Sequence, residues 1–91
     1  MTKEKFLKLL DKYQEEFEAL QITPMEFPLD KFITSGEDEL NIGHCYRMLP
    51  ELRKHIEAGK MEKAYRWLGF IQGCMWSHGI YTIDMMRGDN R

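Results

Sequence analysis

The residue types that most often carry catalysis or bind metals are three histidines and two cysteines, namely His44, His55, His78, Cys45 and Cys74. His44 and Cys45 are adjacent in a segment that reads as helix, so their side chains diverge and make a poor chelating pair. The sequence contains no zinc, calcium or phosphate-loop spacing. Both cysteines fall in apolar segments, whereas a reactive thiol needs an accessible, electropositive setting. We therefore expect no enzyme activity, no metal and no cofactor, and two free structural thiols in a reducing cytosol.

Basic side chains surround a predicted turn at Gly59, and such a helical hairpin could contact phosphates. Residues 42–66 hold six Lys or Arg and three Glu, a net charge of +3, whereas residues 1–41 hold five Lys and ten Asp or Glu, a net of −5. The basic residues could therefore match an anionic partner or the acidic half of the same chain. The candidate anion or nucleic-acid contacts are Arg53, Lys54, Lys60, Lys63 and Arg66.

The most apolar segment, residues 66–79 (RWLGFIQGCMWSHG), contains glycines within a predicted helix. A glycine in a helix interior lowers helix stability by about 1 kcal/mol relative to alanine, so we expect two of them to serve a packing or functional role. Gly69, Gly73 and Ser77 follow a four-residue spacing and form one ridge of small residues, against which another backbone can pack closely. We call these three residues the small-residue ridge. The large side chains of this candidate close-packing or interface region are Trp67, Phe70 and Trp76.

Three interpretations of the small-residue ridge are open at this stage. It packs on the first or second helix of the same chain, or on its own copy in a symmetric dimer. Alternatively, the glycines open a slot for a flat or anionic ligand, with Tyr65, Trp67 and Trp76 stacking on it and Arg66 binding a phosphate. Because residues 64–76 are apolar almost all round, this helix is expected at the buried centre of a bundle.

Four elements are predicted to position these residues, which makes the fold all-α. An amphipathic helix over residues 2–20 begins at the cap Thr2, and a second helix over 36–58, opening at Ser35, keeps one apolar phase through Pro50. The short connection at Gly59 predicts an antiparallel hairpin with a third helix over 60–78, which ends near Gly79. Thr82 then caps a short C-terminal helix.

Residues 21–35 are predicted to be an ordered crossover that lies on the core, because they are too apolar for a free linker. Thr23 and Pro24 fit the start of one helical turn. The 91 residues correspond to a single helical domain, residues 1–91, and 43% hydrophobic and 31% charged residues are typical of soluble domains. No apolar stretch reaches the ~20 residues of a spanning helix, so we expect no membrane association and a cytoplasmic protein.

Residues 59–91 resemble the C-terminal part of a group of small uncharacterised bacteriophage proteins that carry R-W-L-G-F-x-Q-G-x-x-W, then G-x-Y-T-I and a polar ending in Asn-Arg. The resemblance covers about the last third of the chain and implies a phage origin and a setting in the host cell cytoplasm. The matching positions are Arg66, Trp67, Leu68, Gly69, Phe70, Gln72, Gly73, Trp76, Gly79, Tyr81, Thr82, Ile83, Asn90 and Arg91.

Small phage accessory proteins often bind host factors, including defence systems, and redirect or inhibit them. We therefore expect a non-catalytic accessory protein that binds a host macromolecule, and a homodimer as its favoured oligomeric state. The alternatives are a nucleic-acid-associated protein that uses the basic hairpin of residues 53–66, and a protein that binds a small nucleotide ligand. The charge near neutrality, −2 overall, disfavours a generally basic nucleic-acid binder.

Overall fold

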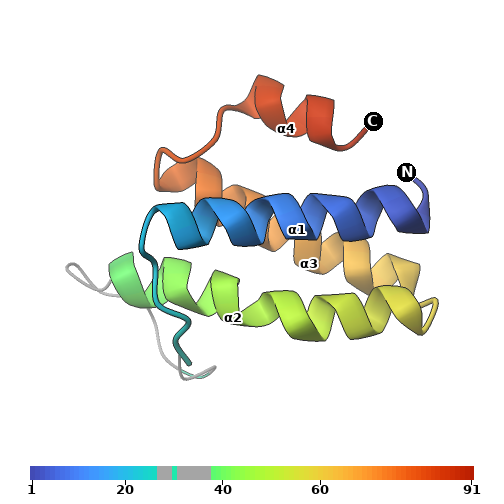
Figure 1. Cartoon of the computed structure of the whole chain (residues 1–91), viewed down its shortest axis with the longest axis horizontal. Helices are drawn as coiled ribbons and strands as arrows, with labels where there is room; N and C mark the ends of the chain where they lie inside the picture. The colour runs from blue at the N-terminus through green and yellow to red at the C-terminus, as the bar shows by residue number, and fades with distance from the viewer. Residues whose placement is uncertain (27–29, 31–37) are drawn as a thin grey trace.

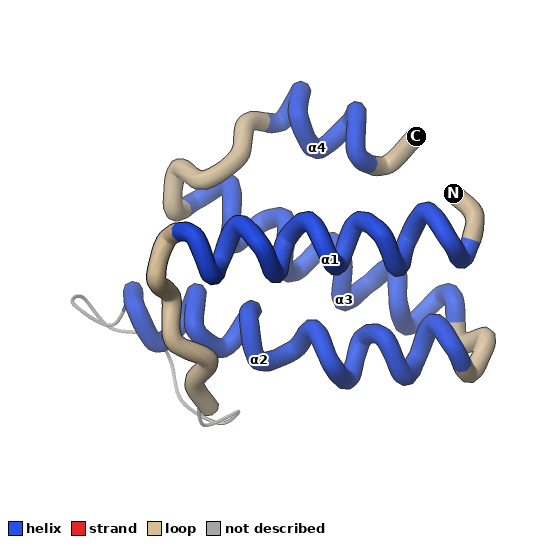
Figure 2. The backbone as a smooth tube through the Cα atoms, in the orientation of Figure 1, coloured by secondary structure: helices blue, strands red, loops and turns tan. Residues whose placement is uncertain are grey.

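The computed structural model describes residues 1–26, 30 and 38–91, and it confirms the predicted all-α bundle of three main helices and a short fourth one. Figure 1 shows α1 between α4 and α2, with α3 running behind α1, and Figure 2 shows that loops connect the helices throughout the described chain. The helices are α1 (Lys3–Ala19), α2 (Asp38–Glu57), α3 (Met61–Ser77) and α4 (Ile83–Asp89).

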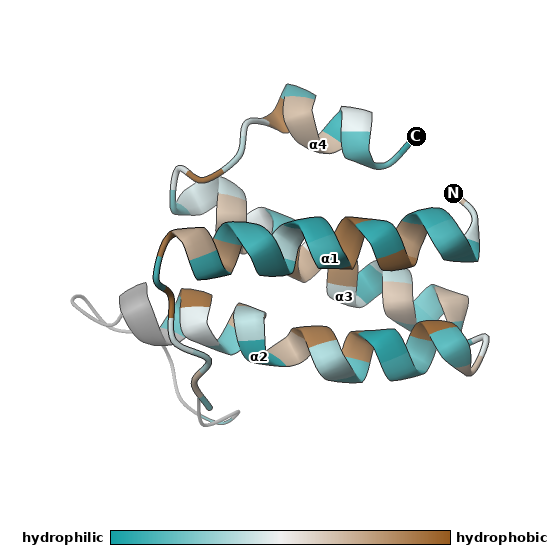
Figure 3. Ribbon diagram, in the orientation of Figure 1, coloured by the Kyte–Doolittle hydropathy of each residue, from teal (hydrophilic) through white to brown (hydrophobic). Residues whose placement is uncertain are grey.

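Helix α1 is the amphipathic helix that the sequence predicts. Its cap is Thr2, whose hydroxyl accepts a hydrogen bond from the Lys5 N–H at 3.1 Å. Hydrophilic colouring dominates the viewer-facing side of α1 in Figure 3. Leu20 continues the three-to-four-residue spacing of the apolar face of this helix, but it lies beyond the helix end and is 52% exposed. The residues that α1 buries are Phe6, Leu9, Leu10, Tyr13 and Phe17.

Helix α2 runs unbroken through Pro50, as the continuous apolar phase predicts. Proline has no N–H to donate to the carbonyl four residues earlier, yet the helix keeps one buried face because Cys45, Leu49 and Leu52 lie on both sides of it. The expected cap Ser35 lies outside the described residues. The helix ends as predicted at Gly59, where φ is +77°, a left-handed value that favours glycine.

Helix α3 returns antiparallel to α2 and ends where Gly79 adopts φ of +72°. Its expected place at the buried centre of the bundle is wrong. The core side is made by Ala64, Leu68, Ile71, Gln72 and Met75, while the opposite face is open to solvent. No other helix of the described chain covers this opposite face of α3, since a Cβ added at Gly69 or Gly73 would meet nothing within 4 Å.

Helix α4 is held across α1 and α3 by polar contacts that the sequence analysis did not anticipate. The Tyr13 hydroxyl donates to Asp89 Oδ2 at 3.0 Å and accepts from Gln72 Nε2 at 2.9 Å. Lys12 pairs with the other oxygen of Asp89 at 2.8 Å. Gln72 and Asn90 also exchange amide hydrogen bonds. Thr82 caps α4 as predicted, since its hydroxyl accepts from the Met85 N–H.

The described part of the crossover, residues 21–26 and 30, contains no helical turn, so the one expected at Thr23 and Pro24 is wrong. Its backbone instead crosses α2 at Gly43, where the Met25 N–H donates to the Gly43 carbonyl at 3.0 Å. A Cβ added at Gly43 would lie 2.6 Å from the Thr23 carbonyl oxygen. Gly43 is therefore the glycine that permits a close backbone approach within the described chain. The rest of the crossover, 27–29 and 31–35, lies outside the described residues.

Candidate binding surface on helices α2 and α3

The outward face of α3 is apolar at its edges and nearly flat in its middle. Phe70 is 52% exposed and Trp76 is 54% exposed, and both lie on the solvent side of the helix. Successive helix positions turn by 100°, which places Gly69 and Gly73 between these two aromatic side chains. Large exposed aromatic residues grouped on one face mark interaction sites more often than single exposed apolar residues do.

The small-residue ridge contacts no other part of the described chain. A Cβ added at Gly69 or Gly73 would meet nothing within 4 Å. Ser77 is exposed, and its hydroxyl donates to the carbonyl of Cys74 on the same helix at 3.0 Å. Packing of the ridge on the first or second helix of the same chain, which was one of the three interpretations, is therefore wrong.

A groove of about 500 Å³ lies beside this face, between α2 and α3. Met48, Trp67 and Phe70 provide apolar surface, and charged or polar side chains of both helices complete the walls. Phe70 belongs to the groove and to the outward face alike, so the two form one continuous surface. We call the groove and the outward face of α3 together the α2–α3 surface. The groove is lined by His44, Arg47, Met48, Glu51, Arg66, Trp67 and Phe70.

Some of the charged side chains around the groove have ion-pair partners within the described chain and one does not. Arg47 pairs with Glu26 of the crossover, and Glu51 pairs with Lys54 at 3.1 Å. Arg66 is exposed and has no ion-pair or hydrogen-bond partner within residues 1–26, 30 and 38–91. His44 Nδ1 is buried without a hydrogen-bond partner in the same ranges. The groove therefore offers an unpaired guanidinium next to aromatic surface, a combination suited to an anionic group attached to an apolar one.

Trp67 and Trp76 do not form one stacking slot. Trp67 is half-buried and meets the His55 ring edge-on, with centroids 4.8 Å apart. Trp76 lines a different cavity near α4, and Tyr65 stacks on Phe6 of α1. The predicted joint stacking of a ligand on all three aromatic residues is therefore wrong, although Trp67 and Arg66 do line the same groove.

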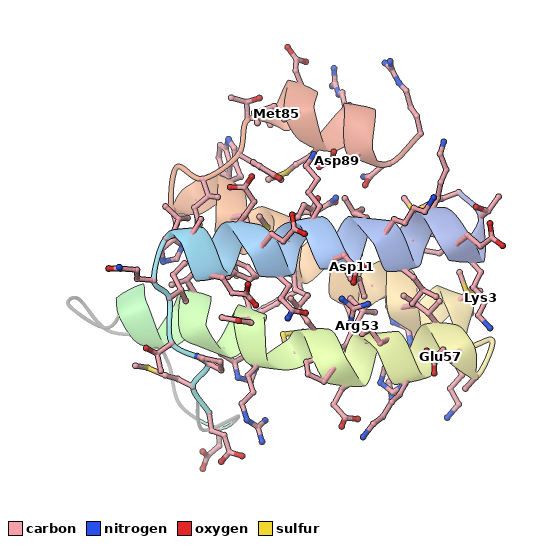
Figure 4. All side chains as sticks on the ribbon, viewed as in Figure 1. Lys3, Asp11, Arg53, Glu57, Met85 and Asp89 are labelled. Atoms are coloured by element: carbon pink, nitrogen blue, oxygen red, sulfur yellow. The ribbon has the colours of Figure 1, made fainter. Side chains whose placement is uncertain are left out.

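The basic hairpin is partly neutralised by the chain itself. Arg53 Nη2 donates to Asp11 Oδ1 of α1 at 2.6 Å, and the two side chains meet between α1 and α2 in Figure 4. Lys54 pairs with Glu51. Lys60, Lys63 and Arg66 lie together around the start of α3, with Glu62 among them. Two of the five predicted anion contacts are thus engaged in ion pairs, and one of them, Arg53, pairs with the acidic half of the chain.

Partial burial and the neighbouring charges of Lys63 and Lys60 lower the pKa of His55, which favours the neutral form of its ring. The Lys63 ammonium lies 5.9 Å from the centre of the Trp67 ring. The positive charge at this end of the groove therefore comes from lysine and arginine and not from histidine.

Sequence reasoning missed Gly43 and the contacts of Gln72. It singled out the glycines of α3 because they follow a regular spacing, whereas the close contact at Gly43 depends on a chain crossing that no local pattern shows. Gln72 carried a usable signal, since a polar residue on the apolar side of a helix must find hydrogen-bond partners.

No family model, curated protein or solved structure matches the chain. No helix in the described ranges is both long and apolar enough to cross a membrane. Within the same ranges, no three His, Cys, Asp or Glu side chains are grouped so that they could hold a metal ion.

Proposed function

We propose that this protein is a non-catalytic binding protein that docks on a partner protein through the α2–α3 surface. This agrees with the expectation of a phage accessory protein that acts on a host macromolecule. The observation that carries the proposal is the position of Phe70, which is half-exposed and lines both the groove and the outward face of α3. An aromatic side chain at the centre of a patch is the usual anchor of a protein interface.

The glycines of α3 support a close approach by another chain. Each costs about 1 kcal/mol of helix stability relative to alanine, and nothing in the described chain occupies the space above Gly69 or Gly73. A partner backbone that packs on the ridge between Phe70 and Trp76 would offset this cost, because dispersion contacts strengthen when no side chain holds the helices apart.

The charge of the groove favours a partner that carries a carboxylate beside an apolar side chain. Arg66 has no partner within the described chain, and Arg47 shares its charge with one exposed glutamate. An acidic side chain that reaches Arg66 would make a charge-assisted hydrogen bond, while its apolar neighbour covers Trp67. Such pairs at the rim of an interface act mainly on the rate of association.

A second copy of the chain is the other occupant that a specific observation favours. The small-residue ridge is self-complementary across a two-fold axis, since the same three small residues would face each other. The nucleic-acid alternative has less support, because Arg53 and Lys54 are paired within the chain. The molecular mass in solution separates the homodimer from a complex with another protein.

The test is capture of partner proteins from a bacterial lysate by tagged wild-type protein and by two variants, with quantitative mass spectrometry. Phe70→Ser removes the proposed anchor, and Met85→Ser is the matched control because Met85 is similarly exposed, at 48%, on α4 and does not line the groove. We expect partners whose recovery falls at least tenfold with Phe70→Ser and is unchanged with Met85→Ser. Recovery that is equal for both variants contradicts the proposed surface.

A further inference from the structure

Cys45 and Cys74 lie on facing turns of α2 and α3. Cys45 is fully buried in the core, and Cys74 is half-buried against the same core. The Cys74 thiol donates to Asn41 Oδ1 at 3.5 Å. Asn41 precedes Cys45 by one helical turn and so lies on the same side of α2. This contact places the Cys74 sulfur beside the turn of α2 that carries Cys45.

The two thiols also differ in acidity. The neighbouring Cys45 thiol, helped by the nearby charge of His78, lowers the pKa of Cys74 to about 7 against the opposing effect of burial. The same contact and burial raise the pKa of Cys45. Cys74 is thus the more exposed and more acidic thiol, which is the character of an attacking cysteine, and Cys45 is placed to react second.

We propose that Cys45 and Cys74 form a disulfide that joins α2 to α3 when the protein meets a small-molecule disulfide such as glutathione disulfide. The Cys74 thiolate, having released its proton to water, attacks one glutathione sulfur and displaces the other as a thiolate, which takes up a proton. Cys45 then loses its proton and attacks the Cys74 sulfur, releasing the second glutathione. Two protein thiols are oxidised and one glutathione disulfide is reduced to two thiols.

This reaction is a property of the folded hairpin. Folding and disulfide formation are linked in one thermodynamic cycle. The factor by which the disulfide raises the folding equilibrium constant therefore equals the factor by which folding raises the equilibrium constant for disulfide formation. For a loop that closes about thirty residues, this factor is on the order of 500-fold. The proposal is independent of partner binding and needs no partner in its test.

The experiment equilibrates the native protein with glutathione redox buffers and measures intact mass and free thiols. We expect the product to have lost two hydrogen atoms, with both thiols consumed and both restored by dithiothreitol. The equilibrium constant for its formation should be about 500-fold larger in native buffer than in concentrated urea. A lasting glutathione adduct, a disulfide-linked dimer, two unreacted thiols or an equal constant in urea overturns the proposal.

Two variants test the order of the steps. Cys45→Ser should stop at a glutathione adduct on Cys74, and Cys74→Ser should leave Cys45 unreacted because it is buried. Helical circular dichroism checks that each variant folds, and the wild-type result stands without them. Fast modification of Cys45 in a folded Cys74→Ser variant contradicts the assigned order.

Discussion

The side-chain amides of Gln72 and Asn90 bind each other in both directions, with Gln72 Nε2 donating to Asn90 Oδ1 at 2.7 Å and Asn90 Nδ2 donating to Gln72 Oε1 at 3.2 Å. Gln72 also donates to the buried Tyr13 hydroxyl at 2.9 Å, so this one amide joins α1, α3 and the end of α4. Such a buried polar group is costly unless all of its partners are in place.

Gln72→Met tests the role of this amide, because it keeps the volume and removes the hydrogen bonds. We expect the free energy of unfolding to fall by about 1–3 kcal/mol, as Tyr13 loses a donor and Asn90 loses its partner. Urea unfolding measures the change. The control is Gln14→Met, whose amide donates to Glu18 at the surface and accepts only a long hydrogen bond from Arg53 at 3.5 Å, and it should cost less than about 0.5 kcal/mol. Equal effects of the two substitutions would remove the case for the Gln72 network.

The glycines of α2 and α3 should respond oppositely to alanine. In purified protein, Gly69→Ala and Gly73→Ala should each raise the free energy of unfolding by about 0.5–1 kcal/mol, because the added Cβ meets open space. Gly43→Ala should lower it by more than about 1 kcal/mol, because its Cβ would clash with the Thr23 carbonyl oxygen. If Gly73→Ala lowers the free energy of unfolding as well, we assign this to a second copy of the chain that covers the ridge. Sedimentation equilibrium should then show a wild-type dimer whose affinity the variant lowers.

The buried tyrosine of α1 should make stability depend on pH in the alkaline range. Burial is the main cause that raises the pKa of Tyr13 in the folded protein above the unfolded value of about 10. Because the pKa is higher in the folded than in the unfolded protein, the contribution of Tyr13 to the free energy of unfolding is complete below pH ~10. Above that pH, the free energy of unfolding falls by up to about 1.4 kcal/mol per pH unit. Urea unfolding between about pH 9 and pH 11.5 should give a steeper fall in the free energy of unfolding for wild type than for Tyr13→Phe. Parallel pH profiles would contradict this role of Tyr13.

The unpaired arginine of the groove should influence association more than stability. Arg66→Glu is expected to slow partner association by about tenfold or more at low salt, with little change in melting temperature, because the side chain is exposed and unpartnered in the described ranges. Arg87→Glu on α4 is the matched control, since Arg87 is also exposed and lies outside the surface. Surface plasmon resonance at two salt concentrations measures both rates. A loss that is the same for the two variants would assign the effect to net charge alone.

The four helices could be predicted because their signals are local. Thr2 and Thr82 accept the capping hydrogen bonds that their positions imply, and Gly59 and Gly79 adopt the left-handed conformation that ends a helix. Pro50 does not end α2, and the unbroken apolar phase on both sides of it was the correct guide.

The position of α3 could not be predicted, because composition does not say which neighbours a helix has. Phe70 and Trp76 were predicted to be close-packing or interface residues, and in the described chain both are more than half exposed. The close approach at Gly43 likewise depends on where the crossover passes, which is a tertiary property. The sequence predicted part of the groove, because Arg66 and Trp67 were candidate site residues. It could not predict that His44 and Arg47 line the same groove, because this depends on how α2 packs on α3.

The most direct test of the proposed function replaces Phe70 by a photoreactive benzophenone amino acid and irradiates the protein in a bacterial lysate. The same amino acid at Met85, which is 48% exposed on α4, is the control. The account predicts adducts from position 70 that saturate, that unlabelled wild-type protein displaces and that position 85 does not give; an adduct of twice the chain mass identifies a second copy as the occupant. The same adducts from both positions, or adducts that the competitor does not displace, would contradict binding through the α2–α3 surface.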